Sequence, residues 1–334
     1  MEQGKTQMFT LSQLETAAAL VHGVMPPTPQ ICWPLLSERA GAEVWVKHEN
    51  HTPIGAFKLR GGIVYMEALK RREPGLSGVV TATRGNHGQS VGFAARRAGL
   101  AAVVVVPHGN SVEKNRAMRS LGVELVEHGH DFQAAYEHAA ELAGTRGLHM
   151  LRSYHPLLIQ GVASYSLELL RAVAGLDTVY VPIGLGSGIS GMIAARDALG
   201  LKTKVVGAVA EAAPAYALSF AAGKPVSTNS ADTIADGVAC RVPDADAVAV
   251  INRGAERIVA VSEVEIAAAM RHYFTDTHNL AEGAGAAPLA ALLKERAQMA
   301  GKRVGLVLSG GNVDRAVYAP ILSAGDGEEK GGTT

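Results

Sequence analysis

The sequence predicts an α/β protein with two lobes, each a mostly parallel twisted sheet flanked by helices. The chain has 334 residues, 48% of them hydrophobic and 19% charged, which is long and apolar enough for a large core divided between two lobes. Its short Val-rich runs are apolar throughout their length, as parallel strands are when helices cover both faces of the sheet. These runs alternate with segments of helical periodicity.

The alternating segments fall into two series. The first is strand 78–83, helix 86–99, strand 101–108, helix 111–122, strand 123–129 and helix 131–144. The second is strand 178–184, helix 188–200, strand 204–211, a strand and helix at 257–274, and strand 303–311. Ser262 followed by Glu265 matches a capping box, which predicts a helix start. We expect a small domain at residues 61–149, inserted into a large domain of residues 1–60 and 150–325, and a disordered tail at 326–334.

The composition does not favour a charged macromolecular partner. The formal net charge is zero, so neither nucleic acid nor an anionic membrane is indicated, and a small neutral or zwitterionic ligand is expected. Cys32 and Cys240 lack the spacing of metal ligands and are expected to be reduced thiols. The N-terminal stretch has no secretory pattern, and no apolar run is long enough to span a membrane, so we expect a cytoplasmic protein.

The segment from His51 to Gly62 sets Phe57 directly before Lys58. One interpretation is a surface lysine whose stem lies along apolar surface. The other is an amine used in a Schiff base, which needs a partly desolvated site so that the free amine is accessible near neutral pH. Phe57 is either the apolar wall of that site or an ordinary core aromatic.

A strand passes through a glycine turn into a helix at Thr83, Gly85, Asn86 and His87. Backbone N–H groups at such a turn bind carboxylate or phosphate. Alternatively, Asn86 is simply the N-cap of the helix and His87 a structural histidine.

A second glycine turn follows the strand at 178–184 and contains Gly184, Leu185, Gly186, Ser187 and Gly188. Such a turn wraps backbone amides around a phosphate. Gly186, Gly188 and Gly191 also match G-x-G-x-x-G, and Glu211 follows at the spacing of a ribose-binding acid. Taken alone, this pattern favours a nicotinamide dehydrogenase.

Two further side chains are candidates for the same site. Ser309 comes just beyond the last buried strand, and ligands bind at the carboxyl ends of strands in such sheets. Glu282 stands at a glycine-rich helix start, where it either faces the site or interacts favourably with the helix N-terminus.

Together these motifs resemble the fold type II pyridoxal-phosphate enzymes, in particular the branch of threonine and serine dehydratases and serine racemase. The resemblance covers nearly the whole chain, and its carriers are the segments 47–62, 83–90, 155–161, 181–191, 233–238, 281–291 and 308–312. It implies pyridoxal 5'-phosphate as cofactor, bound by the large domain, and a homodimer or larger homo-oligomer. It also implies β-elimination of a β-hydroxy amino acid, L-threonine or L-serine, to a 2-oxo acid and ammonia, as a catabolic ammonia-lyase.

The resemblance also implies residue roles. Lys58 would form the Schiff base and act as general base, and Phe57 would pack against the ring. Gly184 to Gly188 would hold the phosphate, Asn86 the ring hydroxyl, and Ser309 the pyridine nitrogen. The implied substrate-binding residues are Thr83, Arg84, Gly85, Asn86, His87 and Glu282. Because a neutral hydroxyl does not hold the pyridine nitrogen protonated, the ring is a weaker electron sink, which favours elimination.

The sequence departs from the family pattern at several positions. Arg84 stands where serine racemase has a catalytic serine, and a permanently protonated arginine cannot cycle as acid and base, so racemisation is not favoured. Arg84 either binds a second carboxylate, as in 3-hydroxyaspartate, or lies in solvent or in a structural ion pair. Ala56 replaces the usual serine before the Phe-Lys pair. Glu211 matches the first ligand of the relatives' cation site, but Ala217 replaces a later acidic one, so no metal is expected.

Other functions remain as alternatives. The site also suits a dehydratase for 3-hydroxyaspartate or phenylserine, or a racemase-type isomerase. An NAD-dependent oxidoreductase is a distant alternative, because its fingerprint comes midway along the chain and leaves Lys58 and Ser309 unexplained. A non-catalytic binding protein would have no need of an intact Lys58.

Overall fold

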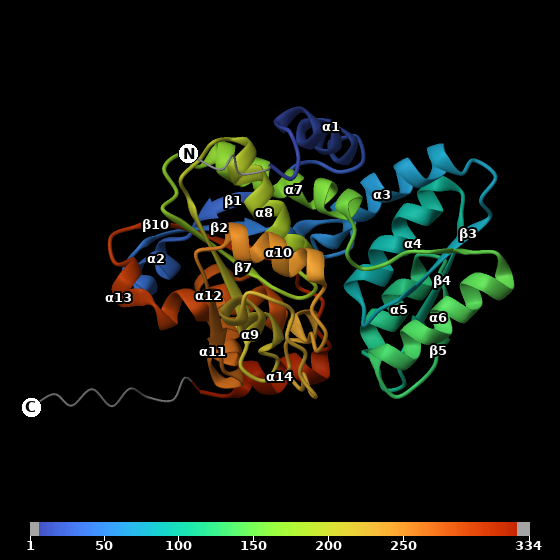
Figure 1. The fold of residues 1–334 in the computed structure, drawn as a ribbon. Coiled ribbons are helices and arrows are strands. Elements are labelled where there is room, and N and C mark those ends of the chain that lie inside the picture. Colours follow the sequence, from blue (N-terminus) through green and yellow to red (C-terminus); the bar gives the residue numbers. More distant parts are fainter. Residues whose placement is uncertain (1–6, 326–334) are drawn as a thin grey trace, which may run out of the picture.

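The structure, a computed structural model, describes residues 7–325 and contains two separate sheets (Figure 1). Each sheet with its covering helices is here called a lobe: the large lobe holds the six-stranded sheet and the small lobe the four-stranded one. The predicted α/β class with two lobes is confirmed. No described helix is long and apolar enough to cross a membrane. The expected tail at 326–334 lies outside the described residues.

The large sheet has the strand order β1, β2, β10, β7, β8, β9. The strands are β1 (Gln30–Cys32), β2 (Glu43–His48), β10 (Arg303–Leu308), β7 (Thr178–Pro182), β8 (Lys204–Ala210) and β9 (Arg257–Val261). β1 is antiparallel to β2, and all other neighbours are parallel. The carboxyl ends of β2, β10 and β7 therefore meet at one edge, where the chain continues into the predicted motifs.

The small sheet has the strand order β5, β4, β3, β6, and all its pairs are parallel. Its strands are β5 (Glu124–Glu127), β4 (Ala101–Val106), β3 (Gly78–Ala82) and β6 (His149–Met150). These strands fall close to the limits expected for the small domain. The domain boundaries at 61 and 149 stay a prediction.

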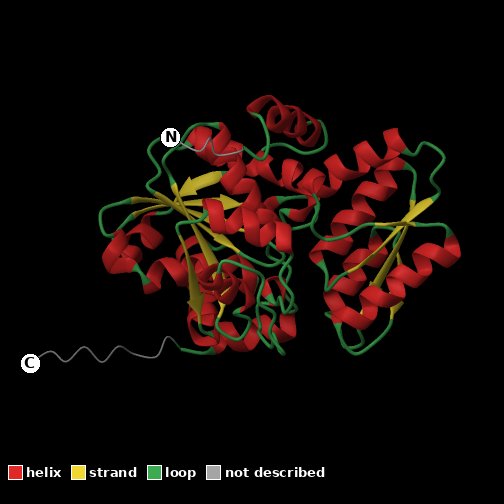
Figure 2. Cartoon of the chain, in the orientation of Figure 1, coloured by secondary structure: helices red, strands yellow, loops and turns green. Residues whose placement is uncertain are grey.

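Helices cover both faces of each sheet (Figure 2). Those of the small lobe are α3 (Lys58–Arg72), α4 (Asn86–Ala98), α5 (Val112–Ser120) and α6 (Phe132–Arg146). Those of the large lobe are α1 (Leu11–His22), α2 (Pro34–Ala40), α7 (Pro156–Ala172), α8 (Ser187–Ala198), α9 (Ala215–Ala222), α10 (Ala245–Gly254), α11 (Glu263–Thr277), α12 (Gly283–Lys294), α13 (Arg296–Met299) and α14 (Arg315–Ser323). The capping box of Ser262 and Glu265 is present at the start of α11 and confirms that prediction.

Two helix N-termini cap one another between the lobes. Asp314, which precedes α14, accepts hydrogen bonds from the Ser111 hydroxyl and from the Val112 amide at the start of α5, the latter at 3.1 Å. In return, Glu113 of α5 accepts the Arg315 amide of α14 at 3.0 Å. Each carboxylate thus meets the positive end of the other lobe's helix, which stabilises the observed arrangement of the lobes.

A buried charged cluster joins α3 to the large lobe. Arg60 is completely buried, and its guanidinium donates to Glu49 at 2.6 and 3.0 Å and to Glu168 at 2.6 and 2.9 Å. Lys47 of β2 also donates to Glu168, at 2.5 Å. Burial alone would raise the pKa of Glu168, but Arg60 and Lys47 outweigh it and lower that pKa to about 2. Since two cations face two carboxylates, removing one member leaves a buried charge without its partner.

We expect Glu168→Gln to lower the free energy of unfolding by about 3–5 kcal/mol, because Lys47 then loses its contacting carboxylate and Arg60 keeps only that of Glu49. Urea unfolding followed by circular dichroism measures this. The matched control is Glu15→Gln, which removes an exposed pair with Arg171 and should cost less than about 1 kcal/mol. Equal effects of the two substitutions would show that the buried cluster contributes no more to the free energy of unfolding than an exposed ion pair does.

The same cluster predicts an acid dependence. Because the folded-state pKa of Glu168 lies below its unfolded value of 4.5, its stabilising contribution is complete above that pH and is lost as the pH falls towards about 2. The Glu168→Gln variant should therefore lose less stability than the wild type over this interval. Parallel acid-unfolding curves for the two proteins would contradict the assignment.

Candidate active site

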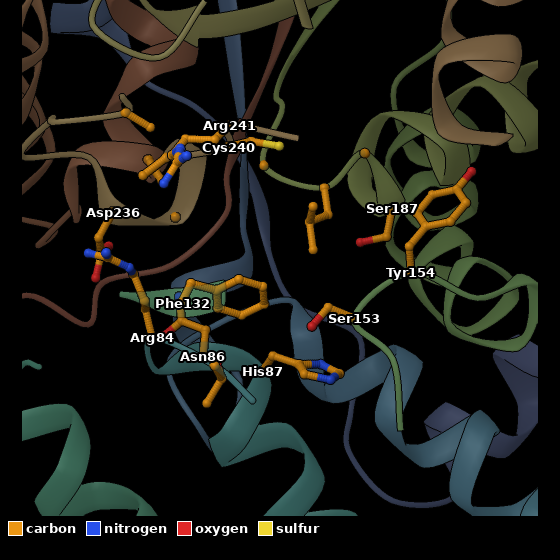
Figure 3. Close-up of a pocket in the computed structure, with 18 of the residues that line it drawn as sticks. Arg84, Asn86, His87, Phe132, Ser153, Tyr154, Ser187, Asp236, Cys240 and Arg241 are labelled. Carbon is orange, nitrogen blue, oxygen red and sulfur yellow. The ribbon is translucent and has the colours of Figure 1, made fainter. Parts of the chain in front are cut away.

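A cavity of about 1000 Å³ lies between the two lobes. It is lined by the segments that follow β2, β3, β7 and β10 and by residues between 229 and 246. Figure 3 shows Asn86 and His87 on one side of this cavity and Ser187 and Tyr154 on another. The carboxyl ends of parallel strands from both sheets therefore open into one space, which is where ligands bind in such folds.

Lys58, the first residue of α3, lines this cavity and is half-buried. Its Nζ donates to Ser187 Oγ at 3.2 Å and lies 5.0 Å from the centre of the Phe57 ring. Burial lowers the pKa of Lys58 to about 8, so about a tenth of the amine is unprotonated at pH 7, far more than for a lysine in water. The interpretation of Lys58 as a surface residue is wrong, and the desolvated amine required for Schiff-base chemistry is present.

Hydrogen bonds between two loops fix the position of Lys58. The Phe57 amide donates to the Ser309 carbonyl oxygen at 3.0 Å, and the Gly311 amide donates to the Gly55 carbonyl oxygen, also at 3.0 Å. Ala56 forms a bridge with Gly310 between these contacts. The loop after β2 is thereby paired with the loop after β10, which places Lys58 and the nearly buried Ser309 in one cavity.

The turn after β3 differs from one prediction. Gly85, with a φ of 155°, is the N-cap of α4, and its amide donates to Thr83 Oγ1 at 2.9 Å. A Cβ at Gly85 would lie 2.4 Å from Lys114 Cδ, so only glycine fits. The alternative in which Asn86 is the N-cap is therefore wrong. The side-chain amide of Asn86 instead donates to Glu282 Oε1 at 2.7 Å.

His87 is buried in the cavity wall, and its Nε2 has no hydrogen-bond partner in residues 7–325. Burial, assisted by the charge of Lys58, lowers the pKa of His87 to about 3. A neutral imidazole with an unpaired buried nitrogen costs free energy unless a ligand binds it. His87 is therefore not a structural histidine with both ring nitrogens hydrogen-bonded.

The glycine turn after β7 leads into α8 and lines the cavity. Gly186 is the N-cap with a φ of 94°, and a Cβ at Gly184 would lie 2.3 Å from the carbonyl oxygen of Gly237. Tyr216 donates its hydroxyl to the Leu185 carbonyl oxygen at 3.0 Å, which holds the turn. Backbone N–H groups at a helix start of this kind suit a phosphate, so the turn fits a phosphate-bearing cofactor.

Glu282 lines the cavity and belongs to a cluster of charged side chains with Lys114 and Asp236. The sequence did not predict this cluster. Its Oε2 lies 3.4 Å from Lys114 Nζ, which also contacts Asp236 at 2.5 Å. Burial raises the pKa of Glu282 to about 7, against the opposing effect of the Lys114 ammonium. Lys114 comes from an otherwise ordinary amphipathic helix, and only its distant partners mark it as a site residue.

Arginines line the outer part of the cavity. Arg84 is exposed and makes no ion pair or hydrogen bond within the part of the chain that the structure describes. Arg152 and Arg241 also line the cavity, and each has a carboxylate within 4 Å: Asp244 at 3.7 Å and Asp131 at 3.5 Å. Arg84 is therefore the arginine of this group whose charge is not already balanced by a contacting carboxylate.

Glu211 and Cys240 are not suited to take part in catalysis. Glu211 contacts Lys294 at 3.0 Å and does not line the cavity, and the described residues contain no cluster of three or more potential His, Cys, Asp or Glu ligands. Cys240 does line the cavity, but burial raises the pKa of its thiol to about 12, so it is protonated. Cys32 and Cys240 are both free thiols, as expected.

Comparisons with known proteins agree with this geometry. A family model described as pyridoxal-phosphate dependent enzyme matches residues 22–310. The chain is 32% identical to an L-threonine ammonia-lyase from Thermotoga maritima, over 95% of this chain and 79% of that protein. It is 31% identical to an L-threo-3-hydroxyaspartate ammonia-lyase from Saccharomyces cerevisiae, over 92% of this chain and 93% of that protein.

The solved structure of maize serine racemase is also similar, with a TM-score of 0.87 and 27% identity, over 93% of this chain and 96% of the other. The family match contains Lys58, both glycine turns and Ser309 within one continuous span. It accounts for the glycine fingerprint at Gly186 to Gly191 without a nicotinamide cofactor. The chain therefore belongs to the family of pyridoxal-phosphate dependent enzymes.

Proposed function

We propose that this enzyme is an ammonia-lyase that acts on a β-hydroxy amino acid, L-threonine or L-serine, and releases a 2-oxo acid and ammonia. The observation that carries the proposal is the half-buried amine of Lys58, which has a lowered pKa and lies beside the glycine turn before α8. The relatives named as ammonia-lyases, which align over more than nine-tenths of this chain, support the reaction class.

The proposed cofactor contacts are those that the resemblance to the dehydratase branch implies, and their residues line one cavity. Gly184, Leu185, Gly186, Ser187 and Gly188 bind the phosphate of pyridoxal phosphate, and Phe57 forms one wall of the ring site. Asn86 binds the ring hydroxyl and Ser309 the pyridine nitrogen. When bound, the cofactor supplies an electron sink for the substrate α-carbon. A serine hydroxyl at the ring nitrogen keeps that sink weak, which favours rapid loss of the β-substituent.

The residues of the chain carry out the remaining tasks. The turn from Thr83 to His87 receives the substrate α-carboxylate on its backbone amides. Lys58 accepts the α-proton, and its lowered pKa provides the neutral amine for this step. The β-hydroxyl group leaves, and the released enamine hydrolyses to the 2-oxo acid and ammonia. Glu282 accepts a hydrogen bond from Asn86 and thereby orders the part of the site that binds the substrate.

A second candidate substrate is 3-hydroxyaspartate. The exposed Arg84 without an ion pair favours it, because a guanidinium binds a second carboxylate with two hydrogen bonds. The similarity to the yeast hydroxyaspartate ammonia-lyase supports the same possibility. Comparing L-threonine, L-serine and L-threo-3-hydroxyaspartate as substrates decides between them.

We also propose that the enzyme is cytoplasmic and forms a homodimer or larger homo-oligomer, with residues 61–149 as its small domain. The resemblance of the motifs to the dehydratase branch supports the assembly. Sedimentation of the purified protein tests it.

Replacing Lys58 by alanine should abolish turnover of L-threonine and L-serine while leaving the fold intact, because a single buried amine is removed. Ammonia release measures turnover, and circular dichroism reports the fold. Lys204→Ala is the control, since Lys204 forms an exposed pair with Glu256. Wild-type activity in Lys58→Ala would overturn the mechanism.

Replacing Arg84 by serine should raise production of D-serine from L-serine, because a serine hydroxyl can donate a proton on the face opposite Lys58. Chiral chromatography of the products measures this. The same variant should lose activity on 3-hydroxyaspartate if Arg84 binds the second carboxylate. No change in D-serine would show that another feature prevents racemisation.

A further inference from the structure

We propose that Ser187 relays a proton from Lys58 to the departing β-hydroxyl group of the substrate. The proposal rests on the β-elimination proposed above and names the acid that this reaction needs. Hydroxide is a poor leaving group, so a β-hydroxyl group must gain a proton as its bond to carbon breaks.

The geometry of Ser187 suits this task. Its hydroxyl lies 3.2 Å from Lys58 Nζ and is the side-chain partner of that amine within residues 7–325. Ser187 is 2% exposed and lines the cavity, and Figure 3 shows its hydroxyl projecting into that space from the start of α8.

The position of Ser187 also strengthens it as a donor. It is the first residue of α8, a helix of 12 residues, and the positive end of a helix favours the developing negative charge on a hydroxyl that gives up its proton. Because the side chain is almost fully buried, bulk water does not compete for the transfer.

Other titratable groups near the cavity are less suited. His87 Nε2 has no hydrogen-bond partner in residues 7–325, so it is not connected to the Lys58 amine. Tyr154 shares a hydrogen bond with Ser190 at 3.2 Å and not with Lys58. Glu282, at the start of α12, forms an ion pair with Lys114 of α5, with 3.4 Å between Oε2 and Nζ.

The step balances as follows. Lys58 takes the α-proton and becomes an ammonium. As the bond between the β-carbon and its oxygen breaks, the Ser187 hydroxyl gives its proton to that oxygen and takes one from the Lys58 ammonium. Water leaves, the α,β double bond forms, and both Lys58 and Ser187 return to their starting protonation states. No oxidant or further reactant is needed.

The leaving group provides the sharpest test. Chloride departs without a proton, so β-chloro-L-alanine does not need the relay, whereas L-serine does. With saturating pyridoxal phosphate, Ser187→Ala should lower the ratio of kcat for L-serine to kcat for β-chloro-L-alanine about 100-fold, since any change in phosphate binding affects both substrates alike. Ser190→Ala, one turn further along α8, removes a buried hydroxyl that bonds Tyr154 instead and should leave both values unchanged.

The outcomes separate the two proposals. Equal losses on both substrates, or no loss on L-serine, would overturn the relay, and the second result would assign the acid to another group such as the cofactor phosphate. A wild-type protein that turns over β-chloro-L-alanine but neither L-serine nor any other 3-hydroxy amino acid would overturn the proposed function itself.

A measurement on the cofactor-free protein tests the Lys58–Ser187 contact independently of activity. The pH dependence of Lys58 acylation, followed by peptide mass spectrometry, should have its midpoint near pH 8 in the wild type. An ammonium donates to the serine hydroxyl more strongly than a neutral amine does, so Ser187→Ala should move the midpoint down by about half a pH unit or more. An unmoved midpoint would show that the contact is absent in solution and would overturn the relay.

Discussion

The desolvation of one amine is the constraint on which the rest of the structure depends. Lys58 is half-buried in the cavity wall, and desolvation lowers its pKa to about 8. A lysine left in water would stay protonated and would neither form a Schiff base nor accept a proton at neutral pH. The paired loops after β2 and β10, the Phe57 ring and the cavity between the lobes all serve to hold this amine away from solvent.

A second requirement is that polar groups at the contact between the two lobes are paired. The charged residues around the site meet this requirement. Lys114 reaches from the small lobe to Asp236 and Glu282 of the large lobe, and Asp314 and Glu113 exchange helix caps nearby. The buried Arg60 anchors α3, and so Lys58 at its start, to the large lobe. Position and protonation of the amine are therefore set by contacts from both lobes.

The sequence predicted the features that depend on local pattern. The strand and helix series, the capping box at Ser262, and the two glycine turns are local, and the structure confirms them. Lys114 was missed because it lies on an ordinary helix and gains its meaning only from Asp236 and Glu282, more than 100 positions away. The sequence left open whether Asn86 is the N-cap of α4, because the contact between the Asn86 side-chain amide and Glu282 is a tertiary one. The interaction of Ser187 with Lys58 likewise needs the fold.

The central claim is that Lys58 binds pyridoxal phosphate covalently, and the absorbance spectrum of the purified protein before and after borohydride tests it most directly. We expect a Schiff-base band in the near-visible region that disappears on reduction, with the pyridoxyl mass on the peptide that contains Lys58. A colourless protein that pyridoxal phosphate does not reconstitute, or a label on another lysine, would contradict the account.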